Sequence, residues 1–563
     1  MKYIISYILL KDAMKHNLPH GDNYGSINTN MVGFNAAVVT NHWMASAVGR
    51  DILMKGGNAF DAACAISFML GVVEPQMSGI GGDGFIMMYD SKKDKVNVIN
   101  ATGPAPEFSY KIGDSIPIKG IQAASVPGIV SGVIKMHKLK GSLSLQECLA
   151  PAVEAASNGV ALSQDQSTSL KSDSKAENFQ SSLKIWGDKK KGLKNFGDRV
   201  INKDLAETLK LISIEGEGAF YRGKIADKIV KISDENDGLF SINDFKNFEA
   251  EIQEPISTTY RGYDVFEAPP NSSGITLLQQ LNIIENFSQK DLSPFSKSAM
   301  HLMVEAKRLA FYDREKYLAD PKFFDVPVDL MLDKNYAKEL SNKININGPR
   351  ISNEELAINY KPDRVGDTTY FCVVDKDGNS VSQLQSIQTQ WGSGMVIDGT
   401  GILMNNRMSY WHLDKNHINY LIPGKRVRHT MNPVMVFKSN GSVNKLCLVN
   451  GTPGADTQVQ TNMQVLSSII DHNFLVGEAV SMPRWTHFQN LTESTIPHST
   501  SEFISLESRF GDEIVKNIER MGHKIKIVGP WEGSGSQGMI SISENGLIGA
   551  AVDPRRDGQA LVW

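Results

Sequence analysis

Residues 367–386 constrain the fold most strongly, because their pattern predicts a β-hairpin. Residues 367–375 are rich in β-branched and aromatic side chains, which favour strands. Residues 377–379, Asp-Gly-Asn, supply a turn, and residues 380–386 alternate as a returning strand. A polar, charged segment over residues 354–366 predicts an exposed linker ahead of the hairpin. Periodicity alone indicates no more than one hairpin of a larger sheet.

A predicted helix pair and two predicted strands lie near the N-terminus. Between Met44 and Glu74, apolar residues recur at helical spacing. Gly56-Gly57 is typical of a helix stop, and Asn58 of the N-cap of a second helix. Strands are then predicted at residues 85–89 and 96–99. Helices are thus followed by sheet in this part of the chain.

The glycine-rich loop between these helices and strands matches G-x-G-x-x-G at Gly79, Gly81 and Gly84. A dinucleotide site requires a strand before this motif and a helix after it. The order here is reversed, so we expect no nucleotide cofactor. We instead predict a tight turn that needs positive φ angles.

The composition of the 563 residues, with 41% hydrophobic and 21% charged residues, is typical of a globular protein with a large core. A net charge of −4 without a Lys/Arg stripe argues against a nucleic acid partner. No apolar run reaches the roughly 18 residues that a membrane-spanning helix needs. The apolar run at residues 3–10 lacks a clear cleavage site, so a cytoplasmic location is favoured and secretion stays open. The four cysteines form no C-x-x-C pair and predict buried apolar side chains.

Motifs over most of the chain resemble those of the γ-glutamyltranspeptidase family. The small subunit of that family opens with Thr-Thr and continues as V-V-D-x-x-G-N-x-V, and residues 368–381 match this order. Landmarks of both subunits occur elsewhere in register, at residues 56–62, 81–85, 123–128, 392–394, 401–406, 451–454 and 553–556. The resemblance runs from about Ala36 to the C-terminus.

The resemblance implies the four-layer αββα sandwich of the N-terminal nucleophile hydrolases, which is an α/β fold. It also implies a precursor that cuts itself between Asp367 and Thr368. A large subunit, residues 36–367, and a small subunit, residues 368–563, would then stay packed as a heterodimer, and further oligomerisation stays open. Residues 1–35 would form an N-terminal extension, for which disorder is one interpretation.

The resemblance also implies which residues carry the chemistry, with no cofactor and no metal. Thr368 would be the nucleophile, and its freed α-amine, with a reference pKa of about 7.7–8.0, would be the base. Thr369 is the alternative cleavage position, although the register favours Thr368. Ser386 replaces a family threonine whose hydroxyl contacts the nucleophile's terminus. Gly454 and Ala455 replace a Gly-Gly pair whose N–H groups stabilise the oxyanion.

The positions that would bind substrate depart from the family pattern. Thr102 stands where an arginine grips the glutamyl α-carboxylate, and Tyr410 stands where an acidic residue for the α-amine is expected. Each lost charge-assisted hydrogen bond removes about 1.5–3 kcal/mol. Gln388, His429 and Thr430 replace further binding residues of the family.

Three basic residues are candidates for binding an acidic group in place of the missing arginine: Arg407, Arg428 and His429. A structural role is an equal alternative for each of them.

The resemblance thus implies an autoprocessed hydrolase of small-molecule amides that works through an acyl-threonine intermediate. We expect hydrolysis to dominate transfer, with γ-glutamyl or related small acyl groups as substrates. One alternative is an acylase for non-glutamyl amides, similar to cephalosporin acylases or oxamate amidohydrolases. The other is an uncleaved homologue that only binds a ligand.

Overall fold

The computed structural model describes residues 30–563 except residues 174, 191, 349–366, 440–443 and 490–491. Most of the predicted N-terminal extension and the predicted linker at residues 354–366 therefore lie outside the described residues. Asp367 is described in its backbone and still joined to Thr368.

A seven-stranded antiparallel sheet contains the predicted hairpin. Its order is β23-β2-β12-β13-β3-β4-β9. The strands are β23 (Gln559–Val562), β2 (Ala37–Thr40), β12 (Asp367–Val374), β13 (Ser380–Gln388), β3 (Asp83–Asp90), β4 (Lys95–Ala101) and β9 (Glu251–Gln253). The hairpin β12–β13 and the strands β3 and β4 are confirmed, and Gly378 in the hairpin turn has a φ of 82°.

A second seven-stranded sheet packs face to face on the first. Its order is β1-β22-β21-β17-β16-β11-β10. The strands are β1 (Met31–Gly33), β22 (Ile548–Val552), β21 (Gly538–Ile542), β17 (Asn444–Gly451), β16 (Val434–Ser439), β11 (Tyr263–Glu267) and β10 (Ile256–Tyr260). Gly451 and Gly538 allow the close approach, because a Cβ there would lie 2.4 and 3.0 Å from the Tyr370 ring.

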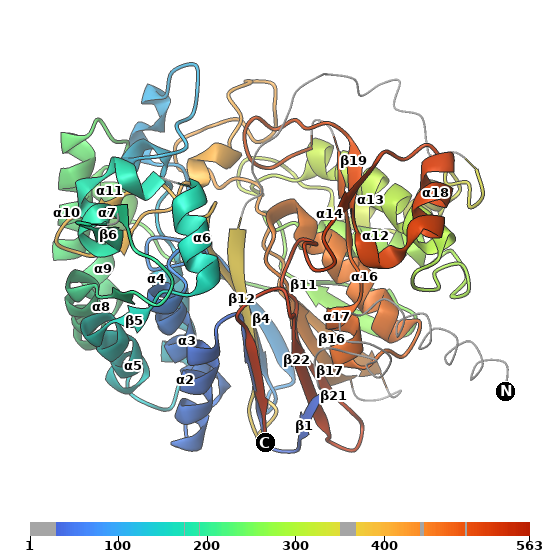
Figure 1. The fold of residues 1–563 in the computed structure, drawn as a ribbon, viewed down its shortest axis with the longest axis horizontal. Helices are drawn as coiled ribbons and strands as arrows, with labels where there is room; N and C mark the ends of the chain where they lie inside the picture. The colour runs from blue at the N-terminus through green and yellow to red at the C-terminus, as the bar shows by residue number, and fades with distance from the viewer. Residues whose placement is uncertain (1–29, 174, 191, 349–366, 440–443, 490–491) are drawn as a thin grey trace.

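Helices cover the outer face of each sheet (Figure 1). On the first sheet lie α2 (Trp43–Met54), α3 (Ala59–Val73) and α4 (Ile129–Lys140), covered in turn by α5 (Leu145–Asn158), α8 (Lys203–Glu215), α9 (Glu217–Tyr221), α10 (Lys224–Glu235) and α11 (Ile242–Lys246). On the second sheet lie α12 (Gly274–Ile284), α16 (Gln458–Ile470) and α17 (Val476–Ser481), with α13 (Lys297–Tyr317), α14 (Val328–Leu332), α15 (Lys334–Ser341) and α18 (Asp512–Arg520) outside them. The predicted αββα layers are confirmed.

The predicted helix pair is confirmed as α2 and α3. Asn58 caps α3, and its side chain and that of Asp61 form a reciprocal capping box. Helix α3 is buried on nearly every side because it lies between the sheet and the outer helices.

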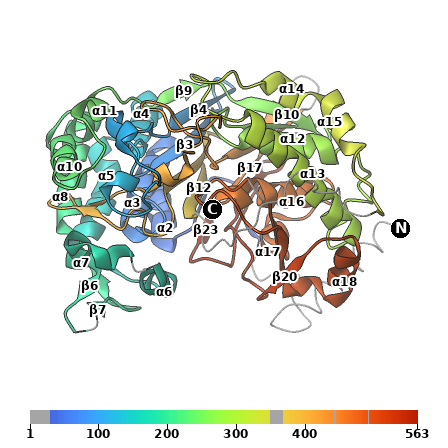
Figure 2. The ribbon, with the colours of Figure 1, turned by 90° about the horizontal axis from the view of Figure 1, so that it is seen from above.

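The smaller elements lie outside the two large sheets. In the helical layer they are α6 (Gln164–Asp173), α7 (Gln180–Trp186), β5 (Val160–Ala161), β6 (Gly187–Asp188), β7 (Gly192–Leu193), β8 (Arg199–Val200), β14 (Val396–Ile397) and β15 (Ile402–Leu403). A three-stranded sheet contains β18 (Trp485–Phe488), β19 (Phe503–Glu507) and β20 (Ile525–Val528). Helices α6 and α7 extend away from the other helices with β6 and β7 (Figure 2).

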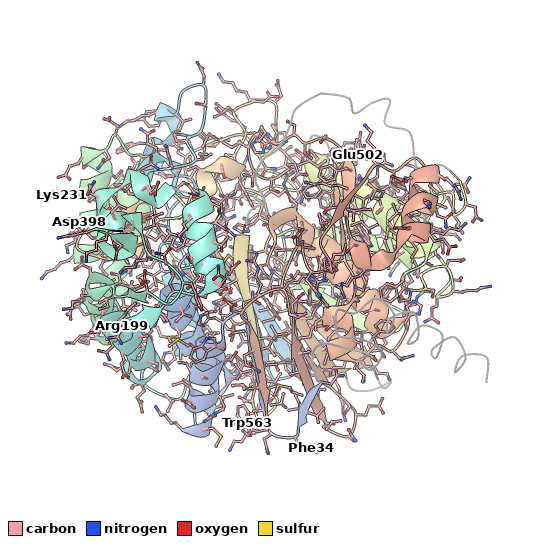
Figure 3. The ribbon with its side chains drawn as sticks, in the orientation of Figure 1. Phe34, Arg199, Lys231, Asp398, Glu502 and Trp563 are labelled. Carbon is pink, nitrogen blue, oxygen red and sulfur yellow. The ribbon has the colours of Figure 1, made fainter. Side chains whose placement is uncertain are left out.

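The two ends of the described chain meet at the edges of the two sheets. The backbone N–H of Asn35 donates to the carbonyl of Trp563 at 2.8 Å, and Phe34 lies beside Trp563 in Figure 3. No helix within the described ranges is both long and apolar enough to cross a bilayer.

The glycine-rich loop before β3 corrects one prediction. No glycine in residues 79–84 has a positive φ. Instead, a Cβ on Gly81 would lie 2.2 Å from the Leu403 carbonyl, and one on Gly82 would lie 2.2 Å from the Ser386 carbonyl. The loop needs glycine because it packs directly against other backbone, including β13, and not because it forms a left-handed turn.

Candidate active site

The ends of four adjacent strands carry several of the candidate residues. Strand β12 begins at Asp367 and β13 ends at Gln388, while β3 begins at Asp83 and β4 ends at Ala101. Each strand is antiparallel to its neighbour, so the four strand ends lie at the same end of the sheet. In Figure 1 this end of the sheet is at the upper end of β12. The predicted cleavage bond therefore lies where the sheet ends.

A β-bulge aligns Thr368 with Ser386. Thr369 pairs with Gln385, but Asp367 pairs with Gln388 instead of residue 387. Residues 386 and 387 of β13 therefore lie opposite the single residue Thr368. Bulges re-aim side chains and are frequent beside active sites. The Thr368 hydroxyl donates to the Ser386 hydroxyl at 3.3 Å, and both residues are buried. Ser386 also accepts the backbone N–H of Gln388 at 2.8 Å.

Thr369, the alternative cleavage position, points to the other face of the sheet. Its hydroxyl donates to the Glu74 carboxylate at 2.6 Å. The alternation continues along β12, since Tyr370 packs between the sheets and Phe371 packs beneath the helices. The Thr368 side chain therefore faces the second sheet, whereas the Thr369 side chain faces the helical layer.

The turn after β17 leads toward the start of β12. The carbonyl of Asn450 accepts a hydrogen bond from Ser382 at 3.4 Å, and the next residue, Gly451, packs against the Tyr370 ring. The chain thus advances along the hairpin toward the first residues of β12. Residues 452–455 follow in this direction, which brings the turn to the side that Thr368 faces.

Gly454 and Ala455 have left-handed backbone conformations in this turn. Their φ angles are 123° and 49°. A Cβ on Gly454 would lie 2.3 Å from Thr457 Oγ1, which itself donates to the Gly454 carbonyl at 2.7 Å. Neither backbone N–H donates to an acceptor in the part of the chain that the structure describes. Two adjacent N–H groups that have no acceptor among the described residues are suited to binding an oxyanion.

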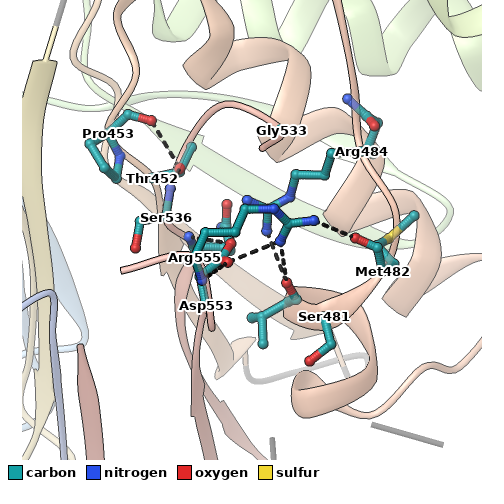
Figure 4. Close-up of polar contacts among 12 residues, drawn as sticks. Thr452, Pro453, Ser481, Met482, Arg484, Gly533, Ser536, Asp553 and Arg555 are labelled. Carbon is teal, nitrogen blue, oxygen red and sulfur yellow. Dashed lines mark hydrogen bonds and ion pairs between the residues drawn. The ribbon is translucent and has the colours of Figure 1, made fainter. Parts of the chain in front are cut away.

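A cluster of buried charged side chains lies beside the turn at residues 452–455. The backbone N–H of Ser536 donates to Thr452 Oγ1 at 2.9 Å. Figure 4 shows Thr452 and Ser536 near Arg484, Asp553 and Arg555. Burial alone would raise the pKa of Asp553, but Arg484 and Arg555 lower it below the ordinary value. The Asp553 carboxylate near this turn thus stays ionised between the guanidinium groups of Arg484 and Arg555.

Five of the predicted substrate residues belong to two polar clusters, and the first extends from Ser386. Gln388 Nε2 donates to Thr495 Oγ1 at 3.0 Å, beside the Gln388–Ser386 bond. The Tyr410 hydroxyl bonds to Thr430 at 3.3 Å and lies near Thr495. Burial raises the pKa of the Tyr410 hydroxyl, so it keeps its proton. The structure therefore joins Gln388, Tyr410 and Thr430 to the partner of Thr368.

The second cluster places Arg407 and His429 on Asp83. Arg407 donates to both carboxylate oxygens of Asp83, at 3.1 and 2.9 Å. His429 Nε2 lies 3.0 Å from Asp83, and its Nδ1 accepts the N–H of Met431, so Nε2 carries the proton. Burial and the nearby Arg407 lower the pKa of His429 to about 4, so the ring is neutral near pH 7. Burial raises the pKa of Asp83, but Arg407 and His429 lower it more.

The remaining candidates also have internal partners. Thr102 donates to Asn100 Oδ1 at 2.6 Å and is fully buried. Arg428 donates to Glu315 at 2.6 Å. Each of the two candidate arginines therefore has a carboxylate partner within the protein, Asp83 for Arg407 and Glu315 for Arg428.

Sequence reasoning missed two residues of these clusters. Asp83 gave a weak signal, since an acidic residue stands between the glycine-rich loop and the apolar part of β3. Thr495 gave none, because it lies in an irregular segment between β18 and β19 whose place is set by tertiary packing.

Comparison with known proteins identifies the family. Residues 45–563 match the family described as Gamma-glutamyltranspeptidase. The "Glutathione hydrolase-like YwrD proenzyme" of Bacillus subtilis (strain 168) is 37% identical over 95% of this chain and 100% of its own length. The "Glutathione hydrolase proenzyme" of Escherichia coli (strain K12) is 33% identical over 91% of this chain and 89% of its own length.

A solved structure supports the same assignment. The cephalosporin acylase from Bacillus halodurans superposes with a TM-score of 0.84 and 31% identity, over 97% of this chain and 99% of that one. The family match spans more than half of the chain, and the fold agrees over nearly all of it. The chain therefore belongs to the γ-glutamyltranspeptidase family.

Proposed function

We propose that this chain is an autoprocessed amide hydrolase in which Thr368 is the nucleophile. The observation that carries the proposal is the placement of the Thr368 hydroxyl, 3.3 Å from Ser386 and on the side of the sheet to which the Gly454–Ala455 turn leads. The relatives named glutathione hydrolase and cephalosporin acylase support this class of reaction, and the word proenzyme in two of those names supports cleavage.

Cleavage of the Asp367–Thr368 bond would create both the enzyme's base and its subunits. Hydrolysis leaves a carboxylate on Asp367 and an α-amine on Thr368. That amine has a reference pKa of about 7.7–8.0, so a useful fraction is unprotonated near neutral pH. The large subunit then spans residues 36–367 and the small subunit residues 368–563. The two sheets would hold the subunits together, since each contains strands from both.

The catalytic cycle follows from this arrangement. The α-amine takes the proton of the Thr368 hydroxyl as its oxygen attacks the substrate carbonyl. The N–H groups of Gly454 and Ala455 stabilise the oxyanion, and collapse expels the amine product with a proton. Water then attacks the acyl-threonine ester and releases the acid, which restores the hydroxyl. Transfer to an acceptor amine is the competing outcome.

The clusters around Ser386 favour a neutral polar acyl group over a zwitterionic glutamyl head. Arg407 and Arg428 each have a carboxylate partner, and His429 is neutral. Gln388, Tyr410 and Thr430 instead offer uncharged hydrogen-bonding groups. We therefore propose weak activity on γ-glutamyl donors, and an acylase for non-glutamyl amides as the second candidate function.

Processing is tested first, by denaturing electrophoresis and N-terminal sequencing of the purified protein. We expect two chains, the smaller beginning Thr-Thr-Tyr-Phe. Thr368→Ala should remain one inactive chain. Thr369→Ala is the matched control and should still be cut, because the Thr369 hydroxyl is bound to Glu74 on the opposite face. A smaller chain that begins at Thr369, or active protein that runs as one band, would refute the proposal.

The substrate class is tested with a panel of amides. Wild-type protein is assayed with γ-glutamyl, glutaryl and oxamyl amides that carry the same leaving amine. We expect the oxamyl amide, whose acyl group is uncharged, to have the highest kcat/KM. A γ-glutamyl amide with a micromolar KM and the highest kcat/KM would contradict the neutral acyl pocket. An uncut protein that binds these amides without turnover would instead support a binding homologue.

A further inference from the structure

The Gly454–Ala455 turn is strained and needs support from its surroundings. Ala455 has a φ of 49°, and left-handed geometry costs a residue with a Cβ about 1–2 kcal/mol. Strained conformations persist where neighbouring contacts over-determine them. The residues that follow Ala455 form buried polar contacts that can supply this support.

Asp456 anchors the turn to the segment that contains Thr495. Its carboxylate accepts the backbone N–H and the hydroxyl of Ser494, both at 2.7 Å. It also forms an ion pair with Arg314. Burial raises the pKa of Asp456, but Arg314 and Arg428 lower it more, so it is a carboxylate near neutral pH.

Arg314 forms a second contact with the same segment. The side chain projects from α13, in the helical layer on the second sheet (Figure 1), and is fully buried. One of its terminal nitrogens donates to Asp456, and the other donates to the carbonyl of Thr492. Its guanidinium group also lies 3.9 Å from the centre of the Phe311 ring. One rigid guanidinium fork therefore binds the turn and the segment at residues 492–495 together.

The segment held in this way reaches the predicted acyl pocket. Thr495 accepts a hydrogen bond from Gln388 and lies near the Tyr410 hydroxyl. Two residues shortly before it, Thr492 and Ser494, bond to Arg314 and to Asp456 respectively. The oxyanion turn and the acyl pocket thus share one support.

We propose that Arg314 and Asp456 are positioning residues, a buried ion pair that aims the N–H groups of Gly454 and Ala455 at the reacting carbonyl and fixes the acyl pocket beside them. The proposal rests on the function proposed above for this turn. If the chain is cut before Thr368, Arg314 belongs to the large subunit and Asp456 to the small one. The pair then makes the geometry of the site depend on the joined subunits.

The expected effect lies in the transition state. N–H groups that are displaced from the oxyanion affect kcat more than KM, because the charge develops only as the bond forms. Loss of one oxyanion donor lowers kcat by about 10²–10³-fold. We expect a fall of this size in Asp456→Asn, and a smaller fall in Arg314→Lys, which keeps the charge but loses the fork.

The experiment compares these variants after cleavage has been verified by N-terminal sequencing. Steady-state kcat and KM are measured with whichever of the glutaryl and γ-glutamyl p-nitroanilides wild-type enzyme hydrolyses faster. Affinity is measured for 4-boronobutanoic acid, whose boron would form a tetrahedral adduct with the threonine hydroxyl. We expect kcat and the affinity for the boronic acid to fall in parallel, with KM within threefold of wild type.

The matched control is Arg308→Gln. Arg308 is also on α13 and buried, and it pairs with Glu305 at 2.8 Å and with Glu502 at 3.1 Å. This variant should lose stability but keep kcat within threefold. If Asp456→Asn is not cleaved, Arg314→Lys alone decides by the same readouts.

Three results would overturn the proposal. They are an unchanged kcat, a lower kcat with unchanged affinity for the boronic acid, and an equal loss in Arg308→Gln. Failure of the underlying function would look different, because wild-type protein would then be uncut and without turnover, or Thr368→Ala would remain active, whatever happens at Arg314 and Asp456.

Discussion

Replacing Gly454 by alanine should remove most of the activity, because the residue has no room for a Cβ and the wrong φ for one. A Cβ there would lie 2.3 Å from Thr457 Oγ1, and the φ of 123° lies outside the regions that L-residues adopt. Backbone strain of about 1–3 kcal/mol and overpacking of about 1–3 kcal/mol together give a cost of about 2–6 kcal/mol. The turn can relieve this cost only by moving its N–H groups.

The expected fall in kcat follows from the displacement of these N–H groups. Loss of one oxyanion donor corresponds to about 2.7–4 kcal/mol, or about 10²–10³-fold in kcat. The assay measures kcat and KM on processed Gly454→Ala protein, together with the free energy of unfolding in urea. Ala455→Gly is the control, since a φ of 49° suits glycine. Relief of strain in the control is offset by greater freedom of the unfolded chain, so we expect a stability change within about 1 kcal/mol and little change in kcat.

The result that would refute this reasoning is specific. Folded, cleaved Gly454→Ala with kcat within threefold of wild type would mean that these N–H groups do not stabilise the transition state. A large loss of kcat in Ala455→Gly would mean that the left-handed alanine itself, and not the clash at Gly454, controls the geometry of the turn.

Three further predictions concern the polar clusters. The pKa of His429 is lowered from 6.5 to about 4, so this ring contributes stability that is present above pH 6.5 and is lost as the pH falls toward 4, about 3 kcal/mol in all. The free energy of unfolding of His429→Gln, measured in urea between pH 7 and 4, should therefore fall less than that of wild type. An identical pH dependence in the two proteins would contradict this prediction. Ser386→Ala should lower kcat about 10-fold, while Ser386→Thr keeps the hydroxyl and most of the activity; equal rates would show that the hydroxyl is not used. Thr102→Arg combined with Tyr410→Asp should raise kcat/KM for a γ-glutamyl anilide by more than the product of the single effects, and no gain would mean that other residues bind the glutamyl head.

The sequence alone determined the local elements. The alternating pattern of residues 367–386 gave the hairpin β12–β13, and helical spacing with the Asn58 cap gave α2 and α3. These signals are readable because strand alternation, helical period and capping act within a few residues. The order of the layers was known only through the family resemblance, and the structure confirms it. The roles of Thr368, Ser386, Gly454 and Ala455 stay predictions, although the structure supports them by its geometry.

Only the tertiary structure decided which side chains meet. Arg407 and His429 were open candidates for binding substrate, and folding places both on Asp83, more than 300 residues away in the sequence. Asp456 and Arg314 are 142 residues apart and meet only because the helices pack on the second sheet. No local pattern records such pairings, because their energies arise from burial and register among strands and helices that are distant along the chain.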